Sequence, residues 1–104
     1  MGSQIIVVAS LFIHSGREFE FRQFETEAAS IMHKYGGRIA QVIHPTSSLT
    51  SEALPYEIHI VMFPSLERFE AYRNDADLAK LTSLREAAIA RTSIIIGEEG
   101  EPYL

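Results

Sequence analysis

Residues 56–63 of the chain read YEIHIVMF, and residues 64–67 read PSLE. The first eight alternate in a way that is typical of a β-strand, where successive side chains point to opposite faces of the sheet. We predict that one set faces the helices and the other set faces away from them. The first set is Tyr56, Ile58, Ile60 and Met62, and the second is Glu57, His59, Val61 and Phe63. Pro64 ends this strand, and Ser65 is placed to cap a following helix.

Two further strands and a helix are predicted upstream. Residues 5–13 are rich in β-branched side chains and predict a strand that is covered on both faces. Apolar residues then recur every three or four positions from Arg17 to Tyr35, which predicts a helix that Gly36 and Gly37 end. Residues 38–44 predict a second strand. The Ser/Thr-rich residues 46–54 predict the loop of a long antiparallel hairpin.

Downstream of the quoted stretch, the pattern predicts helices and a last strand. Phe69 and Tyr72 indicate the buried side of a short helix, and Asn74-Asp75 indicates a break after it. A further helix is predicted from about Leu78 to Arg91, because apolar residues recur at helical spacing. Residues 93–97 predict the last strand, and the acidic residues 98–104 predict a peripheral tail whose end, residues 102–104, could dock on a neighbouring subunit.

The order strand, helix, strand, strand, helix, strand is that of the ferredoxin-like α+β fold, βαββαβ, with a four-stranded antiparallel sheet. Right-handed crossovers place both helical segments on one face of the sheet. The other face would expose Val8, Phe12, Ile39, Ile43, Val61 and Phe63. We therefore predict a homodimer in which a second copy covers this open face, giving a dimeric α/β barrel. Residues 1–104 are predicted to form a single domain, with residues 4–97 as its core and residues 98–104 as its tail.

The composition excludes several classes of function. The 104 residues include no cysteine, which excludes disulfides, thiolate metal sites and a cysteine nucleophile. A formal net charge of −5 has the wrong sign for nucleic acid or an anionic membrane surface, so neither is expected as a partner. The longest apolar stretch, residues 5–13, is too short to span a bilayer and does not resemble a signal peptide, so a cytoplasmic location is expected. No prediction is drawn from residues 1–3, MGS.

Several motifs, in this order, resemble a known family. Residues 58–67 with residues 81–85, LTSLR, are similar to a family of small bacterial domains of unknown function in the dimeric α/β-barrel superfamily, marked by a Phe-Pro-Ser turn. Ser15-Gly16, Phe21, Phe24-Glu25 and residues 35–38, YGGR, are similar to the first half of that family. The resemblance spans residues 5–97 and implies a ferredoxin-like dimer. It implies no single reaction, because relatives in the superfamily include cofactor-free monooxygenases, isomerases, lactone-forming enzymes and haem-degrading enzymes.

His59 and Glu57 are the candidate catalytic residues. By the predicted alternation both point into the surface between two subunits, where a polar side chain needs a partner or a function. His59 would move a proton at neutral pH, and Glu57, on the same face, would orient its ring. The alternative is a histidine that is satisfied by hydrogen bonds across the dimer interface.

Ser10, His14, Gln41 and Arg85 are the candidate substrate-binding residues. By parity Ser10 and His14 point to the open face of the first strand, beside the strand of His59, and Gln41 would add an amide from the second strand. His44 has the opposite parity, and we expect it to be exposed. Arg85 either forms a buried ion pair with Glu25, since both interrupt apolar helix faces, or binds a substrate carboxylate at the mouth of a pocket.

No cofactor and no metal are expected. The four histidines, His14, His33, His44 and His59, fall on separate predicted elements and lack the helical spacing of a metal site. Nothing in their spacing selects an axial ligand for haem. Gly36-Gly37 ends a helix, whereas a phosphate-binding glycine loop begins one. A serine hydrolase is disfavoured because Ser65 reads as a helix cap.

Three functions remain open from the sequence. The first is a small-molecule enzyme without a bound cofactor, which acts by proton transfer or by oxygenation, with His59 as base and Gln41 or Ser10 donating to an oxyanion. The second is a non-catalytic dimeric module that binds a metabolite, and the third is a structural unit that assembles through its tail. An enclosed cavity with converging polar groups would favour the first.

Overall fold

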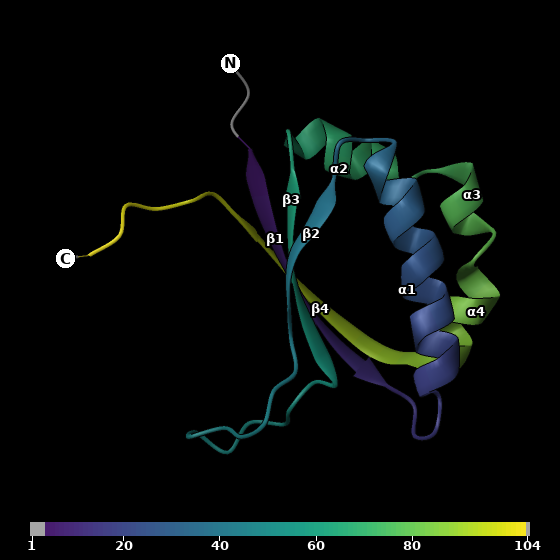
Figure 1. Ribbon diagram of the computed structural model, residues 1–104, viewed down its shortest axis with the longest axis vertical. Coiled ribbons are helices and arrows are strands. Elements are labelled where there is room, and N and C mark those ends of the chain that lie inside the picture. The colour runs from purple at the N-terminus through teal and green to yellow at the C-terminus, as the bar shows by residue number, and fades with distance from the viewer. Residues whose placement is uncertain (1–3, 104) are drawn as a thin grey trace.

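Residues 4–103 are described by a computed structural model, in which a four-stranded antiparallel sheet has the strand order β2-β3-β1-β4. The strands are β1 (Ile5–Ile13), β2 (Arg38–Ile43), β3 (Glu57–Phe63) and β4 (Ile89–Gly97). The helices are α1 (Glu18–His33), α2 (Leu66–Arg73), α3 (Ala76–Ala79) and α4 (Thr82–Ala88). All four helices lie on one side of the sheet (Figure 1). The predicted ferredoxin-like α+β fold is therefore confirmed. Residues 1–3 and Leu104, the end of the predicted docking tail, lie outside the described residues.

The last third of the chain differs from its predicted elements. The helix expected from Leu78 to Arg91 is two short helices, α3 and α4, and the last strand begins at Ile89 rather than at Ser93. Ile89 pairs with Ile13 of β1 and is buried, so ladder hydrogen bonds and burial override the helical spacing there. None of the helices between residues 4 and 103 has the length and apolar content that crossing a membrane requires.

The two glycines that end α1 bring the chain close against the end of β3. Gly36 has a φ of +76°, in the left-handed region, and a Cβ there would lie 2.8 Å from Cγ of Pro64. A Cβ on Gly37 would lie 2.5 Å from the Phe63 ring. Side chains at these two positions would therefore push β2 away from the end of β3.

The core fills the layer between the sheet and the helices. One cluster of buried residues lies at the α2 end of the sheet and the other lies near α4. The first consists of Ile5, Val7, Met32, Val61, Phe63 and Phe69. The second consists of Leu11, Phe21, Phe24, Ala28, Ala88 and Ile89. The helix side of β1 is formed by Ile5, Val7 and Leu11, which leaves Val8 and Phe12 on the opposite side, as predicted.

The predicted orientation of β3 is wrong. Phe63 is 0% exposed and packs on the Phe69 ring of α2, so its side of the strand faces the helices. In the pairing with β1, Val61 lies opposite Val7, and His59 lies opposite Ala9 on that same side. The reason is that both sides of β3 are apolar. Alternation therefore gave the period of the strand but left open which side is covered. Ile39, opposite Val61, also lies on the helix side.

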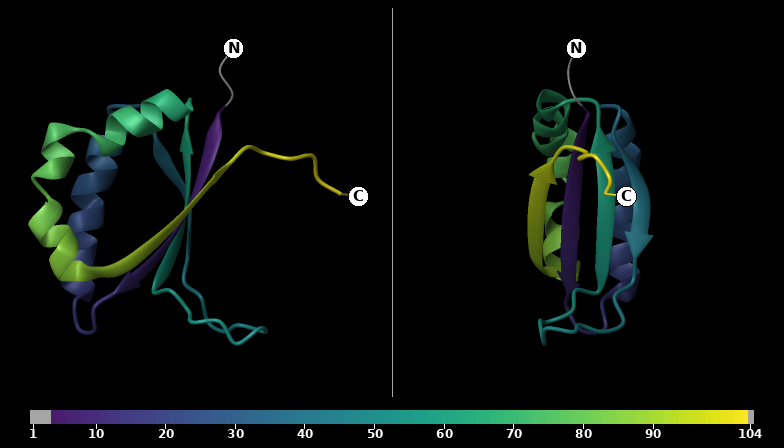
Figure 2. Two further views of the ribbon diagram at one scale, coloured as in Figure 1. Left: turned by 180° about the vertical axis from the view of Figure 1, so that it is seen from behind. Right: turned by 90° about the vertical axis from the view of Figure 1, so that its left-hand side faces the viewer.

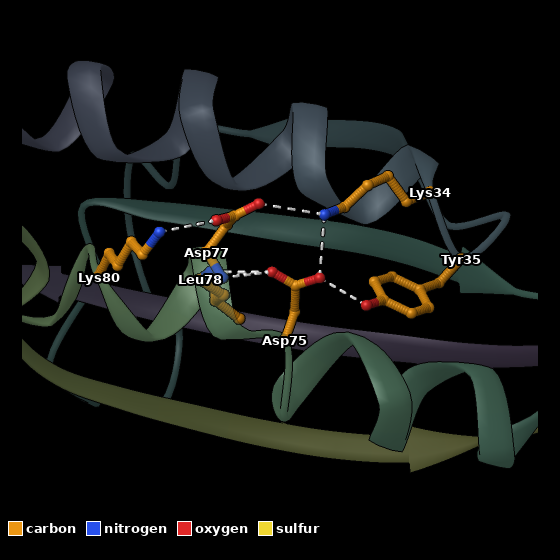
Figure 3. Close-up of polar contacts among 6 residues, drawn as sticks. All are labelled: Lys34, Tyr35, Asp75, Asp77, Leu78 and Lys80. Carbon is orange, nitrogen blue, oxygen red and sulfur yellow. Dashed lines mark hydrogen bonds and ion pairs between the residues drawn. The ribbon is translucent and has the colours of Figure 1, made fainter.

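A polar cluster ties the end of α1 to the start of α3 (Figure 3). Oδ1 of Asp75 accepts hydrogen bonds from the backbone N–H groups of Asp77 and Leu78, at 2.7 and 3.1 Å. Oδ2 accepts one from the Tyr35 hydroxyl at 2.5 Å and lies 3.0 Å from Nζ of Lys34. The hydrogen bonds from Tyr35 and then Lys34 hold the pKa of Asp75 well below its ordinary value of 3.8. Its stabilising contribution is therefore complete above that pH and is lost only in stronger acid.

No helix lies over the other side of the sheet, which we call the open side (Figure 2). The strand pairing places on this side Ile6, Val8, Phe12, Ile43, Ile58, Ile60, Met62 and Ile95, which we call the open-face residues. Ile95 is 65% exposed. The loop between β2 and β3 and the tail after β4 both project from this side (Figure 1).

Candidate functional site

A cavity of about 550 Å³ lies between the sheet and the helices. Its walls are mostly apolar core residues of the strands and of α1, α2 and α3. The polar side chains that line it are Glu25, His59, Tyr72, Arg73, Thr82, Arg85 and Thr92. A volume of this size is typical of sites that bind small organic molecules. The cavity is therefore the candidate site, and it lies on the side of the sheet opposite to the predicted one.

His59 lies at the centre of the polar groups. It projects from β3 toward α1 and is 4% exposed. Its Nε2 atom lies 2.5 Å from Oε2 of Glu57, and its Nδ1 atom lies 3.6 Å from Oε1 of Glu25. Two residues apart on one strand, Glu57 and His59 share a face because side chains of a strand alternate. The predicted contact between Glu57 and His59 is thus present, but it lies beneath the helices.

Glu25 reaches the cavity from α1. It follows Phe21 by one helical turn, so the same spacing that buries the Phe21 ring turns Glu25 toward the sheet. Burial raises the pKa of Glu25 to about 7, with the nearby His59 opposing the shift and the Glu57 carboxylate adding to it. Near neutral pH, this carboxyl group can therefore either accept or donate a proton.

His44 extends the cluster to the surface. It follows the last residue of β2, and its Nε2 atom lies 2.8 Å from Oε1 of Glu57. Its side chain is 70% exposed, in agreement with the prediction, but the sequence did not predict its contact with Glu57. Among residues 4–103, no three His, Asp or Glu side chains are arranged to hold a metal ion.

Three longer side chains line the cavity from the helices. Tyr72 of α2 is partly buried, and burial, followed by the Glu25 and Asp75 charges, raises the pKa of its hydroxyl. Arg73 and Arg85 are exposed, so they lie toward the mouth. Within the described part of the chain, neither arginine forms an ion pair. The predicted Glu25–Arg85 pair is therefore wrong, because Glu25 points toward β3 and meets His59 instead.

The other predicted binding residues do not join His59. Ser10 lies opposite Ile58 and Ser93 on the open side, where it lines a separate pocket of about 490 Å³. Gln41 lies opposite Ile60 and is exposed on that same side, and His14 is exposed beyond the end of β1. These three placements correct the predicted site. The prediction grouped Ser10 and Gln41 with His59 because the predicted orientation of β3 placed His59 on their face of the sheet.

Sequence reasoning also missed several lining residues. Thr92 lies in the part of β4 that preceded the predicted strand, and Thr82 lies in the stretch read as one long helix. From the sequence, Tyr72 is predicted only as a buried helix residue. The useful signal was Glu25, a carboxylate on an apolar helix face, because such a group usually has a buried partner or a function.

A family model described as Domain of unknown function (DUF1330) matches residues 6–98. No curated protein matches the chain. The crystal structure of RPA0582, a protein of unknown function from Rhodopseudomonas palustris, is similar, with 13% identity over 98% of this chain and 86% of that chain and a TM-score of 0.84. SnoaB, a cofactor-independent oxygenase from Streptomyces nogalater, is similar with 10% identity over 97% of each chain and a TM-score of 0.72.

A third similar structure is a candidate antibiotic biosynthesis monooxygenase from Nitrosomonas europaea. It shares 9% identity over 98% of this chain and 95% of that chain, with a TM-score of 0.72. At these identities the likeness shows a common fold. That fold is the one found in proteins named as oxygenases or monooxygenases.

Proposed function

The chain belongs to the DUF1330 family, and on this premise we propose that it is a small-molecule enzyme that moves a proton in its helix-side cavity without a bound cofactor. The observation that carries the proposal is the Glu25 carboxyl group, whose side chain is 19% exposed and which lies 3.6 Å from Nδ1 of His59 in a cavity of about 550 Å³. Apolar walls, a few converging polar groups and a perturbed pKa together are typical of an active site.

In this proposal His59 is the base. When Glu57 is ionised, Nε2 of His59 carries hydrogen and donates it to Glu57 across 2.5 Å. That leaves the lone pair on Nδ1, which is directed to the side of Glu25 and the cavity. Glu57 then fixes the ring and stabilises the imidazolium ion that forms when Nδ1 accepts a proton. An acidic C–H or O–H group of a bound molecule is the proton donor.

Glu25 is the second proton-transfer group. With a pKa of about 7, a large fraction of it is protonated at neutral pH, whereas the base beside it must be unprotonated. Glu25 can therefore return a proton to another atom of the substrate. Exchange of protons with solvent then returns His59 to the neutral ring and Glu25 to the protonated carboxyl group. This sequence isomerises the substrate and needs no oxidant.

The lining indicates the class of substrate. The apolar walls favour an aromatic or aliphatic body, and the arginines near the mouth, Arg73 and Arg85, favour a carboxylate on it. Tyr72, whose raised pKa keeps its hydroxyl neutral, can donate a hydrogen bond to the oxygen of an enolate. We therefore expect an enolisable or phenolic carboxylate of modest size.

Oxygenation is the second candidate, because the fold is shared with a cofactor-independent oxygenase. In that case the substrate anion formed by His59 would react with molecular oxygen instead of accepting a proton from Glu25. Consumption of oxygen separates the two reactions.

The test is the exchange of substrate hydrogen for deuterium in D₂O, followed by proton NMR with a panel of enolisable and phenolic carboxylates. We expect at least one to exchange, and His59→Gln or Glu25→Gln to slow it by roughly 100- to 10,000-fold. Gln41→Ala, on the opposite face, is the matched control and should exchange at the wild-type rate. A compound that raises the melting temperature but shows neither exchange nor oxygen uptake would identify a binding module instead.

We also propose that a second copy of the chain covers the open-face residues. Burial of such a surface is favourable by about 25 cal/mol for each Å² removed from water. The hairpin loop and the tail project from this side (Figure 1) and would reach around a second subunit. The tail is acidic, with Glu98, Glu99 and Glu101, whereas the open side carries Arg38 and Arg91, so two copies are complementary in charge.

A further inference from the structure

Four titratable side chains form a continuous row from the cavity to the surface. Glu25 of α1 lies 3.6 Å from His59, His59 lies 2.5 Å from Glu57, and Glu57 lies 2.8 Å from His44. We propose that Glu57 and His44 form a proton path that connects His59 in the cavity with solvent. This inference rests on the proposed function of His59 as a proton-transfer group.

The row becomes more exposed from His59 outward, while the Glu25 side chain on the cavity side of His59 is 19% exposed. The side chain of His59 is 5% exposed, that of Glu57 is 14% exposed and that of His44 is 70% exposed. A proton on His59 therefore has no direct route to water on the side of Glu57. Each oxygen of Glu57 meets one imidazole, Oε2 that of His59 and Oε1 that of His44. The carboxylate thus bridges a buried ring and an exposed ring.

The partners of Glu57 favour transfer over a purely structural role. Within the described residues, its only ion-pair partners are two histidines. An arginine or lysine would hold this carboxylate ionised, whereas histidine gains and loses protons near neutral pH. Besides Glu25, the titratable or charged side chains that line the cavity with His59 are Tyr72, Arg73 and Arg85. The Phe21 and Tyr56 rings pack beside the row.

The step conserves protons. The imidazolium ion of His59 gives its Nε2 proton to Oε2 of Glu57, and the neutral carboxyl group turns about its Cγ–Cδ bond. It then gives the proton to Nε2 of His44, in the tautomer whose hydrogen is on Nδ1, and His44 releases the Nδ1 proton to water. The exposed ring reaches that tautomer by exchange with solvent. His59 returns to its starting tautomer when Nε2 regains a proton by the reverse path and Nδ1 passes its proton to the Glu25 carboxylate, which lies 3.6 Å away. No electron transfer is involved.

The first experiment needs no substrate. It measures by NMR the rate at which the ring N–H of His59 exchanges with water in the wild type and in His44→Gln. Glutamine can keep a hydrogen bond to Glu57 but cannot carry a proton through its amide. We expect exchange to slow by about tenfold, less than the effect of a group that acts directly on substrate. Added imidazole should restore the rate. His33→Gln, an exposed histidine of α1, is the control.

The direction of the change separates the two explanations. If His44 only holds Glu57 in place, its loss loosens the cluster and the exchange of the His59 hydrogen becomes faster or stays the same. Either result would overturn the proton path. If exchange slows in His44→Gln and added imidazole restores it, the proton path is supported, even if no substrate is ever turned over.

A second experiment separates failure of the path from failure of the proposed function. With a substrate in hand, His44→Gln should lower kcat by about tenfold and leave KM unchanged, with rescue by imidazole. Full turnover in His44→Gln together with loss of turnover in His59→Gln would refute the path and keep the function. Full turnover in both variants would refute the function, and the exchange rate of His59 would then decide the path alone.

Discussion

The helix side and the open side of the sheet are both lined largely by apolar residues, but they differ in what lies over them. On the helix side the covering layer leaves a space of about 550 Å³, and titratable groups from α1, β3 and the end of β2 meet at its edge. On the open side no helix lies over the strands (Figure 2). Its polar residues Ser10, Ser93 and Gln41 are not joined by such a cluster.

This difference shows that apolar surface by itself does not locate a functional site. Both sides carry exposed apolar side chains, Ile43 and Ile95 on the open side and Val42, Ile94 and Ile96 on the helix side. The site is instead indicated by buried ionisable groups, because their burial costs free energy that packing alone does not explain. His59 meets this criterion, and the side chains of Glu25 and Glu57 beside it are only 19% and 14% exposed.

The largest expected effect on stability comes from the helix side. Phe63→Ala should lower the free energy of unfolding by about 3–5 kcal/mol, because Phe63 is fully buried against Phe69 and Tyr72. Urea unfolding measures this loss. Phe12→Ala, on the open side, should cost clearly less since its ring is only partly buried. Equal losses would remove the distinction between the two sides.

The second effect depends on pH. Burial raises the pKa of Glu25 from 4.5 to about 7, so the folded protein binds this proton more tightly than the unfolded chain does. Stability must then fall as the pH rises from about 4.5 to 7. Glu25→Gln removes this dependence. The free energy of unfolding of the variant minus that of the wild type should therefore increase by about 3 kcal/mol from pH 4 to pH 8. Urea unfolding at both pH values tests it, with Glu27→Gln, on the exposed side of α1, as the control. Parallel curves for wild type and Glu25→Gln would contradict the prediction.

The third effect concerns the open side alone. Ile95→Lys should weaken self-association by roughly 100-fold, because a twofold interface contains the new charge twice. Light scattering over a dilution series measures the dimer dissociation constant. Leu66→Lys, an exposed leucine of α2, is the matched control and should leave association unchanged. A wild-type chain that remains monomeric at high concentration would refute the proposed dimer.

The smallest effect tests the helix layer itself. The Ser65 hydroxyl caps α2 by accepting a hydrogen bond from the backbone N–H of Arg68 at 3.2 Å. Ser65→Ala should lower the free energy of unfolding by about 1 kcal/mol. Ser65→Asp should keep most of the stability of the wild type, because its carboxylate can also cap the helix. Thermal unfolding of both variants measures the difference. If Ser65→Asp loses as much as Ser65→Ala, capping is not what the side chain contributes.

Much of the fold could be predicted because its signals are local. The Ser65 cap, the glycines that end α1 and the break at Asp75 each depend on residues within one turn of the chain. The start of β4 could not be predicted in this way. Residues 78–91 have helical spacing, but pairing with β1 begins at Ile89, and that pairing depends on a strand at the other end of the sequence.

The candidate site, too, could be predicted from the sequence only in part. The sequence by itself determined that Glu57 and His59 share one face, because two residues along a strand return the side chain to the same direction. Only the tertiary structure decided which face that is, since β3 is apolar on both sides and the pairing of Val61 with Val7 sets it. Contacts of His59 with Glu25 and of Glu57 with His44 likewise join distant parts of the chain. The physical reason is that alternation shows which side chains share a face but not which face is buried, and packing against the helices decides that.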